Sequence, residues 1–290
     1  MKTILVATDF SPAANNALQY AVKMARFLDA KIILYHAYLS ENYIPDLVLL
    51  EPVKNLHEEF EVMLRKQVEN LAELDKSNIE LRCSPGIAAE SIVAVANEVN
   101  AQWIVAGMKK TGLAFRKIFG TTALTLCRRS LVPLIIVPED ILFRSVRTIA
   151  LASDLKVEHN LMMLDPLASF GASFNARLFV VNVRQKDAHG IDAKAYVALN
   201  MEWSMKELAP KFTFIDDENI GEALNDFIDS NYVDMLALVA HEHSLFERWF
   251  AKSTIKNMMF NGHVPLMILP DKSTIEITQE SVPVIGRLAF

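Results

Sequence analysis

The chain has 290 residues, of which 52% are hydrophobic and 22% are charged. This is enough apolar material for the full core of one large domain or of two ordinary ones. The formal net charge of −6 and the pI near 5.7 argue against a nucleic-acid-binding protein, since such proteins usually carry a broad basic face. The amino-terminal apolar run stops at Asp9, too early for a signal peptide or a membrane span, so we expect a cytoplasmic protein.

The first half of the chain alternates short apolar runs with longer amphipathic segments. Nearly unbroken apolar runs are typical of strands covered on both faces, and they predict strands at residues 2–8, 31–37, 79–83, 102–106 and 131–138. Helical spacing of apolar residues predicts helices between them, at residues 11–28, 53–74, 88–99 and 120–129. Strands that alternate with helices in this way indicate an α/β unit with a parallel sheet and right-handed crossovers.

The same pattern begins again after Val146. Three segments repeat: TILVATD (3–9) as TIALASD (148–154), KIILYHA (31–37) as RLFVVNV (177–183), and VPLIIVP (132–138) as VPLMILP (264–270). Self-similarity over this length predicts a tandem duplication of one α/β unit. We expect domains at residues 1–140 and 146–271 that pack together through a short apolar join, and a carboxy-terminal extension at 272–290.

The most informative stretch is GMKKTGLAFRKIFGTT at residues 107–122, which follows the fourth predicted strand and opens a helix. A helix N-terminus offers unpaired N–H donors and the positive end of a dipole, and glycine lets the backbone approach an anion closely. The basic residues of the loop add positive charge, so this order of elements favours a bound phosphate group. The alternative is that Gly120-Thr121-Thr122 only caps the helix and the basic residues only face solvent.

Asp9 lies between the carboxyl end of the first predicted strand and the helix that begins at Ser11-Pro12. Open α/β sheets place ligand contacts at such positions. A short acidic side chain just before a helix is also a common cap. The sequence leaves both interpretations of Asp9 open.

Two cysteines and several histidines are candidates for reactive or metal-binding groups. Cys83 and Cys127 lack the spacing of a metal site or a redox pair, so both are interpreted as small buried residues, with a reactive thiol as the alternative. His241 and His243 form a His-x-His pair suited to zinc, but no matching ligand cluster is visible in the sequence. Isolated histidines such as His36 are interpreted as packing or surface residues. We therefore expect no metal site.

The five-strand unit, the aspartate that ends its first strand, the glycine loop and the Val-Pro fifth strand make the chain resemble the universal stress protein family. The resemblance covers residues 1 to about 271, as two domains. Family members that hold ATP carry the signature G-x2-G-x9-G-[ST] in the loop. Gly107 and Gly120-Thr121 match it, while Lys110 replaces its second glycine, and a lysine Cβ obstructs backbone conformations that glycine reaches easily.

The resemblance implies an α/β fold of two tandem five-stranded parallel-sheet sandwich domains, Rossmann-like and similar to the adenine nucleotide alpha hydrolases. It also implies ATP, with Mg²⁺, as the ligand of the first domain. Ala7, Thr8 and Asp9 would then border the nucleotide, and the main chain at Ala37 would meet the adenine. The residues that would face the phosphates are Gly107, Lys109, Lys110, Gly120, Thr121 and Thr122.

The second domain departs further from the family pattern. Its loop, VAHEHSLFERWFAKST from Val239, has no glycine, although Asp154 is kept. We therefore expect a degenerate copy that does not hold ATP. Fifth strands commonly pair domains in this family, so the resemblance implies that residues 132–137 and 264–269 meet within one chain as a pseudo-dimer, with a homodimer of chains as a further assembly.

Three functions are compatible with these features. The first is a non-enzymatic stress-response sensor whose first domain binds ATP or a related adenine nucleotide. The second is a scaffold or interaction protein in which both nucleotide sites are degenerate. The third, an enzyme such as a slow ATPase, has little support, because the sequence contains no Gly-x4-Gly-Lys-[Ser/Thr] loop, no nucleophile elbow and no clustered acid and base. We expect the first function.

Overall fold

The computed structural model describes residues 1–39, 56–69, 71, 78–109, 121–155, 161–184, 202, 205–240 and 263–270. The elements of the first half are β1 (Lys2–Ala7), α1 (Pro12–Leu28), β2 (Ala30–Tyr38), α2 (Leu56–Glu69), β3 (Ile79–Pro85), α4 (Ala88–Glu98), β4 (Trp103–Met108), α6 (Thr121–Arg129) and β5 (Leu134–Pro138). Those of the second half are β6 (Thr148–Ala152), η2 (Leu161–Leu164), α7 (Asp165–Phe174), β7 (Arg177–Arg184), η3 (Lys206–Leu208), β8 (Lys211–Asp216), α9 (Ile220–Ser230), β9 (Met235–Ala240) and β10 (Leu266–Pro270).

The strands predicted from apolar runs are all present, and only β5 begins clearly later than expected. The chain before it forms a turn closed by Ser130, whose hydroxyl donates to the Val132 carbonyl at 2.6 Å and accepts from the Val132 N–H at 3.0 Å. These bonds hold the backbone at Val132 in a turn, so the strand starts only at Leu134.

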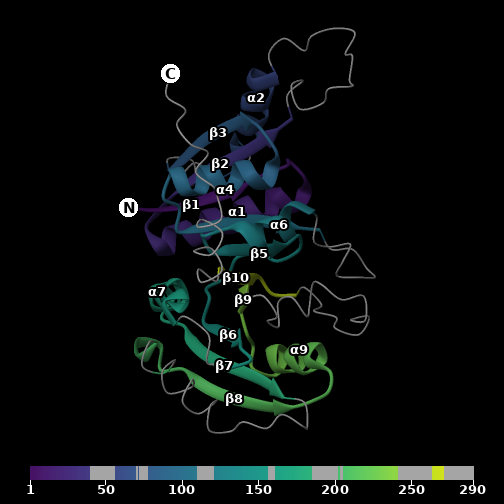
Figure 1. The fold of residues 1–290 in the computed structure, drawn as a ribbon. Coiled ribbons are helices and arrows are strands. Elements are labelled where there is room, and N and C mark those ends of the chain that lie inside the picture. Colours follow the sequence, from purple (N-terminus) through teal and green to yellow (C-terminus); the bar gives the residue numbers. More distant parts are fainter. Residues whose placement is uncertain are drawn as a thin grey trace, which may run out of the picture.

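The strands of both halves form one sheet of ten strands in the order β3-β2-β1-β4-β5-β10-β9-β6-β7-β8. Neighbours within each half are parallel, as predicted. The halves meet where β5 and β10 pair antiparallel, with Leu134 opposite Ile268 and Ile136 opposite Leu266. This seam, visible between β5 and β10 in Figure 1, confirms the prediction that the two fifth strands meet within one chain.

Helices cover both faces of the sheet, and each face carries one hydrophobic core. One core packs under α1, α2 and α7, and the other under α4, α6 and α9. The seam strands contribute to both cores, Ile135 and Met267 to the first, Ile136 and Ile268 to the second. Because each core runs without interruption across the seam, the two halves bury their apolar residues as a single unit.

Helix α1 also ties the halves together through a buried amide. Ser11 caps the helix by accepting the Ala14 N–H, and Pro12 occupies the first turn, as the sequence predicted. Asn16 points to the segment between the halves, where its Nδ2 donates to the Pro138 carbonyl at 2.8 Å and to the Ile141 carbonyl at 2.9 Å. One buried side chain therefore fixes the direction in which the chain leaves β5.

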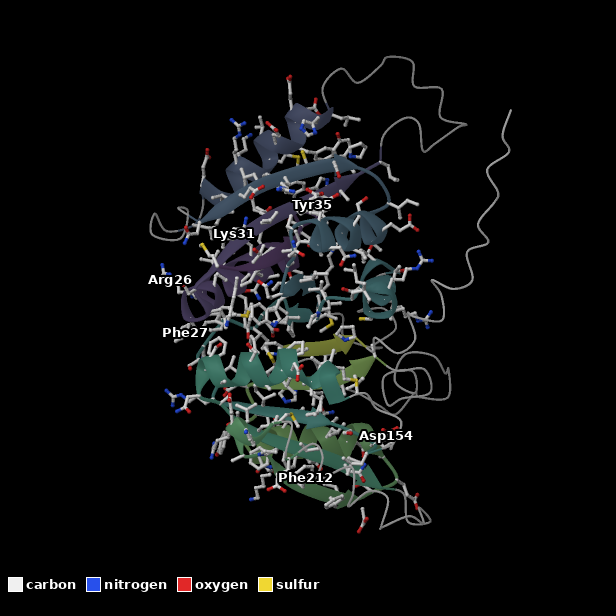
Figure 2. The ribbon with its side chains drawn as sticks, turned by 60° about the vertical axis from the view of Figure 1, so that its left-hand side comes forward. Arg26, Phe27, Lys31, Tyr35, Asp154 and Phe212 are labelled. Atoms are coloured by element: carbon white, nitrogen blue, oxygen red, sulfur yellow. The ribbon has the colours of Figure 1, made fainter. Side chains whose placement is uncertain are left out.

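Aromatic rings continue this contact at the other end of α1. Phe27, labelled in Figure 2, lies 5.4 Å from the ring of Phe174 in α7 and 5.6 Å from that of Phe143, between centroids. Tyr20 meets Phe143 edge-on at 4.9 Å. The expectation that the join packs the halves together is thus met by a cluster of rings at distances typical of favourable aromatic pairs.

The duplication extends to individual hydrogen bonds. In the first half the Thr3 N–H donates to Gln102 Oε1 at 2.6 Å, and in the second half the Thr148 N–H donates to Asp234 Oδ2 at 2.9 Å. Both α1 and α7 end in a residue with a left-handed backbone. Among the described residues, no helix is both long enough and apolar enough to cross a membrane.

Candidate functional site

The strand order of the first half reverses between β1 and β4. In open parallel sheets, ligands bind in the crevice outside the carboxyl ends of the strands at such a point. Ala7, the last residue of β1, pairs with Ala106 of β4. The predicted residues Thr8 and Asp9 therefore leave the sheet beside Gly107 and Lys109, although they are distant in the sequence. We refer to this place as the β1/β4 crevice.

Gly107 lies directly against the first turn of α1. A Cβ atom at this position would stand 2.2 Å from the Ala13 carbonyl oxygen and 2.7 Å from the Ala14 nitrogen, closer than real side chains approach backbone atoms. The first signature glycine is therefore required by helix packing, whether or not a phosphate binds. This packing role was not apparent from the sequence, because α1 lies far from Gly107 along the chain.

Thr8 and Asp9 shape the turn between β1 and α1. The buried Thr8 hydroxyl accepts the Phe10 N–H at 3.0 Å and donates to Gln67 Oε1 of α2 at 3.1 Å. Asp9 is exposed, and its Oδ1 accepts the Ser11 N–H at 3.0 Å. The cap of α1 is Ser11 and not Asp9, which instead closes the turn before the helix, and ligand contact of Asp9 stays a prediction.

Gln67 was not singled out in the sequence, yet it bridges the elements around the crevice. Besides accepting from Thr8, it donates through Nε2 to Asn15 Oδ1 of α1 at 2.6 Å. One amide thereby links the end of β1, the first turns of α1 and the helix α2. The polar floor of the crevice is held by hydrogen bonds between three elements.

Four rings from β2, α2 and the turn after β1 cluster next to Thr8, and we call them the aromatic wall: Phe10, His36, Tyr38 and Phe60. His36 lies at its centre, 4.6 Å from Phe10 and 4.5 Å from Phe60 between ring centroids, and Tyr38 stacks on Phe60 at 4.9 Å. His36 Nδ1 donates to the Thr8 carbonyl at 2.8 Å, which fixes the ring. His36 is a packing residue, as expected, but it packs in the wall of the candidate site.

The main chain of Ala37 faces the crevice. In a parallel strand, alternate residues direct their N–H and C=O groups to opposite neighbours. Tyr35 accepts from Thr8 on the β1 side, whereas Tyr38 accepts from Gly86 on the β3 side. Ala37 therefore directs its N–H and C=O to the β1 side, two residues beyond the last β1 partner, Tyr35.

The second half repeats the turn but not the wall. Ser153 replaces Thr8 and again accepts a following N–H, that of Leu155, at 3.1 Å. Asn182 replaces His36 and donates to the Ser153 carbonyl at 2.7 Å. Val239 stands where the first half has Gly107. The next described element after β6, η2, starts only at Leu161, whereas α1 starts five residues after β1.

Asp154 keeps the position of Asp9 at the end of a strand, and Figure 2 shows it at the carboxyl edge of the second half. Asn182, beside it, is 2% exposed, and its Oδ1 accepts no hydrogen bond from the described residues. The second half thus retains the aspartate of the pattern, while Leu155 and Asn182 stand where the first half has Phe10 and His36.

Several predicted residues lie partly or wholly outside the described part of the chain. Lys110 and Gly120 are outside it, as are His241, His243 and the extension at 272–290. Thr121 and Thr122 begin α6, and because α6 lies in the chain between the parallel strands β4 and β5, its first turn should lie toward the edge of the sheet where β4 ends. Their predicted contact with phosphates stays a prediction.

The two cysteines differ in their surroundings. Cys127 of α6 is buried, as predicted, and burial raises its pKa to about 12. Cys83 was expected to be buried and is instead partly exposed on β3, beside His57 of α2. Cys83 lies on β3, the edge strand of the sheet, and α2 is the described helix that packs on this face, so burial at Cys83 is incomplete.

Comparison with protein family models matches residues 1–138 to the Universal stress protein family. The first half of the chain therefore belongs to this family. Comparison with curated protein sequences found no match.

Solved structures extend the likeness to the whole chain. A universal stress protein from Archaeoglobus fulgidus is similar over 93% of this chain and 98% of its own, with a TM-score of 0.69 and 14% identity. A putative universal stress protein from Pseudomonas aeruginosa is similar over 97% of each chain, with a TM-score of 0.55 and 10% identity. The second half of this chain therefore shares the tandem universal stress protein fold.

Proposed function

We propose that the first half binds an adenine nucleotide, ATP with Mg²⁺, in the β1/β4 crevice, and that the protein is a non-enzymatic nucleotide sensor of a stress response. The observation that carries the proposal is the pairing of the Ala37 main chain with the aromatic wall. An apolar surface beside a few fixed polar groups is the usual form of a small-molecule site.

The Ala37 main chain supplies one donor and one acceptor on the same side of β2. Adenine offers the complementary pair along its edge, since ring N1 accepts and the exocyclic amine donates. Guanine offers the reverse order at these positions, with a carbonyl oxygen and a ring N–H. A fixed backbone pair should therefore discriminate between the two purines, because the wrong base leaves buried polar groups unpaired.

Charge at the crevice supports the placement of the phosphates. Lys109 is exposed at the end of β4, and the first turn of α6 directs N–H groups to the same edge. Asp9 adds a carboxylate suited to a magnesium ion bound by phosphates. With the base at Ala37, the phosphates would extend past Thr8 towards Lys109 and Thr122.

The second half lacks the features that carry this proposal. Leu155 and Asn182 replace Phe10 and His36, so the wall is not repeated at these positions. We therefore propose one nucleotide for each chain, bound by the first half.

A separate cavity of about 450 Å³ lies where the two halves join. Its lining mixes Asp140 and Asp234 with Arg144 and His263, so it favours no single ligand charge. Asp234 is also committed to the Arg147 and Thr148 N–H groups at 2.7 and 2.9 Å. We place the nucleotide in the β1/β4 crevice because, among the described residues, the main chain of Ala37, the aromatic wall and the proposed phosphate-binding edge come together there.

Ala37→Pro tests the base site, because proline removes the N–H that faces the crevice and leaves the bonds from β2 to β3 in place. A ligand at a hundred times its dissociation constant stabilises its protein by about 2.7 kcal/mol. ATP with Mg²⁺ should therefore raise the Tm of the wild type by roughly 5 °C or more, and it should not raise that of Ala37→Pro. GTP should have little effect on either protein.

Val183→Pro is the matched control, since Val183 holds the position of Ala37 in the second half and also lies two residues beyond the last partner of β6. Its ATP shift, measured against its own ligand-free Tm, should equal that of the wild type. Absence of any shift in the wild type would favour the scaffold function. Phosphate release faster than that of Asp9→Ala would favour an ATPase.

A further inference from the structure

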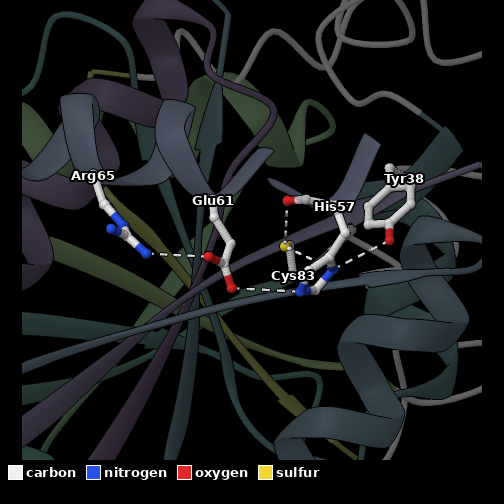
Figure 3. Close-up of polar contacts among 5 residues, drawn as sticks. All are labelled: Tyr38, His57, Glu61, Arg65 and Cys83. Carbon is white, nitrogen blue, oxygen red and sulfur yellow. Dashed lines mark hydrogen bonds and ion pairs between the residues drawn. The ribbon is translucent and has the colours of Figure 1, made fainter. Parts of the chain in front are cut away.

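Helix α2 places a second group of polar side chains over β2 and β3, outside the β1/β4 crevice. His57 Nδ1 lies 3.5 Å from Cys83 Sγ and 3.2 Å from the Tyr38 hydroxyl. The Cys83 thiol also reaches the His57 carbonyl oxygen, at 3.8 Å. Figure 3 shows the thiol and the imidazole facing each other, and Glu61 lying between the imidazole and Arg65.

The second nitrogen of His57 is held by a carboxylate. Nε2 lies 3.4 Å from Glu61 Oε1, and Arg65 donates to Glu61 Oε2 at 3.1 Å. The spacing of four residues brings these three side chains onto one face of α2. A carboxylate beside Nε2 favours the tautomer that carries its hydrogen on Nε2, and in that tautomer the lone pair of Nδ1 faces Cys83 and Tyr38.

Cys83, His57 and Glu61 are arranged like the nucleophile, the base and the orienting group of an activated nucleophile. Cys83 Sγ is the nucleophile, His57 the base in contact with it, and Glu61 a positioning residue that fixes the tautomer of the base. Cys83 is partly exposed, so reagents can reach it. Burial and the negative charge of Glu61 raise the pKa of Cys83 above its usual value, so the thiol is protonated near neutral pH and depends on a base to react.

We propose that Cys83 is a modification site, at which His57 activates the thiol for reversible mixed-disulfide formation with low-molecular-weight disulfides. His57 Nδ1 takes the thiol proton, and the Cys83 sulfur attacks one sulfur of the disulfide. The S–S bond of the reagent breaks, and its second sulfur leaves with the electron pair and takes the proton from His57. Cys83 is oxidised to a mixed disulfide, and one half of the reagent is reduced to a thiol.

The partner of Cys83 must come from outside the chain. The chain has two cysteines, and Cys127 is buried in the core on the opposite face of the sheet. An internal disulfide between them would require the sheet to open. A small disulfide such as oxidised glutathione is the reagent that fits, because the thiol lies in a partly covered position at the sheet edge.

The test uses the full chain with Cys127→Ser, which leaves one thiol, and measures the rate of mixed-disulfide formation with oxidised glutathione by intact mass. At about pH 7, His57→Gln should lower the rate by roughly tenfold or more, since a positioned base contributes at least that much. Glu61→Gln should lower it by a few-fold. Glu58→Gln, an exposed carboxylate on the same turn of α2, should leave the rate unchanged, and Cys83→Ser should abolish modification.

The pH dependence separates a chemical role from a structural one. The described titratable groups that face the thiol are His57 and Glu61 from α2 and Tyr38 from β2. At about pH 10 hydroxide deprotonates the thiol directly, so the deficit of His57→Gln should disappear. A deficit of the same size at both pH values, or no deficit near pH 7, would overturn the proposal.

Discussion

Replacing Met267 by aspartate should destabilise the chain by at least about 4 kcal/mol, a large share of the roughly 5 to 15 kcal/mol by which a typical domain is stable. Met267 is 0% exposed, lies in the middle of the ten-stranded sheet and pairs with Ile135 across the seam. A carboxylate there has no partner among the surrounding apolar side chains, so it must be buried unpaired or protonated, and both states are costly. Urea denaturation followed by circular dichroism measures the loss.

Two controls make this result specific for the seam. Met267→Leu conserves volume and should cost less than about 1.5 kcal/mol. Phe214→Asp introduces the same charge on β8, the outer strand of the second half, where the side chain is 44% exposed, and it should cost far less than Met267→Asp. If Met267→Asp were as stable as Met267→Leu, β5 and β10 would not form the centre of one sheet.

Gly107→Ala should destabilise the first half by about 1 to 3 kcal/mol, the usual cost of inserting a methyl group into a closely packed site. The new Cβ would stand 2.2 Å from the Ala13 carbonyl oxygen, so α1 must move away from β4. Each kcal/mol corresponds to roughly 2 to 4 °C in Tm for a chain of this size class, which differential scanning calorimetry resolves.

Gly171→Ala is the matched control for a glycine in close contact. A Cβ at Gly171 would stand 2.8 Å from Cδ1 of Leu208, which is the end of a flexible side chain. Alanine also favours the interior of α7 by about 1 kcal/mol relative to glycine, so the two effects should nearly cancel. Equal losses for Gly107→Ala and Gly171→Ala would contradict the close approach of α1 to β4.

The sequence predicted the architecture because its signals are local. Strands buried on both faces appear as apolar runs, Ser11-Pro12 marks the start of α1, and the Val-Pro segments mark the two fifth strands. Once the repeat is recognised, few arrangements remain for two such units in one chain. The structure confirms the α/β class, the tandem halves and the seam.

The candidate site could be predicted only in part, because its walls come from distant segments. Phe10, His36 and Phe60 lie on a turn, a strand and a helix, and each taken alone resembles an ordinary core residue. Only the pairing of β1 with β2 and the position of α2 bring them together. The contact between Cys83 and His57 was not predicted either, because the two residues lie on different elements, β3 and α2.

The role of Gly107 changes how the family signature is used. Its contact with α1 explains the glycine by the fold alone, so its presence does not discriminate between a nucleotide site and a scaffold. The Ala37 main chain is the better indicator, because it lies two residues beyond the last pair between β1 and β2. Val239 shows that the second half forms the same strand without this glycine.

A crystal structure obtained in the presence of ATP and Mg²⁺ tests the central proposal most directly. It should show the adenine edge at the Ala37 main chain, the phosphates between Lys109 and the first turn of α6, and no nucleotide beside Asp154. A β1/β4 crevice without nucleotide at saturating ATP, or a nucleotide bound only in the second half, would contradict the proposal.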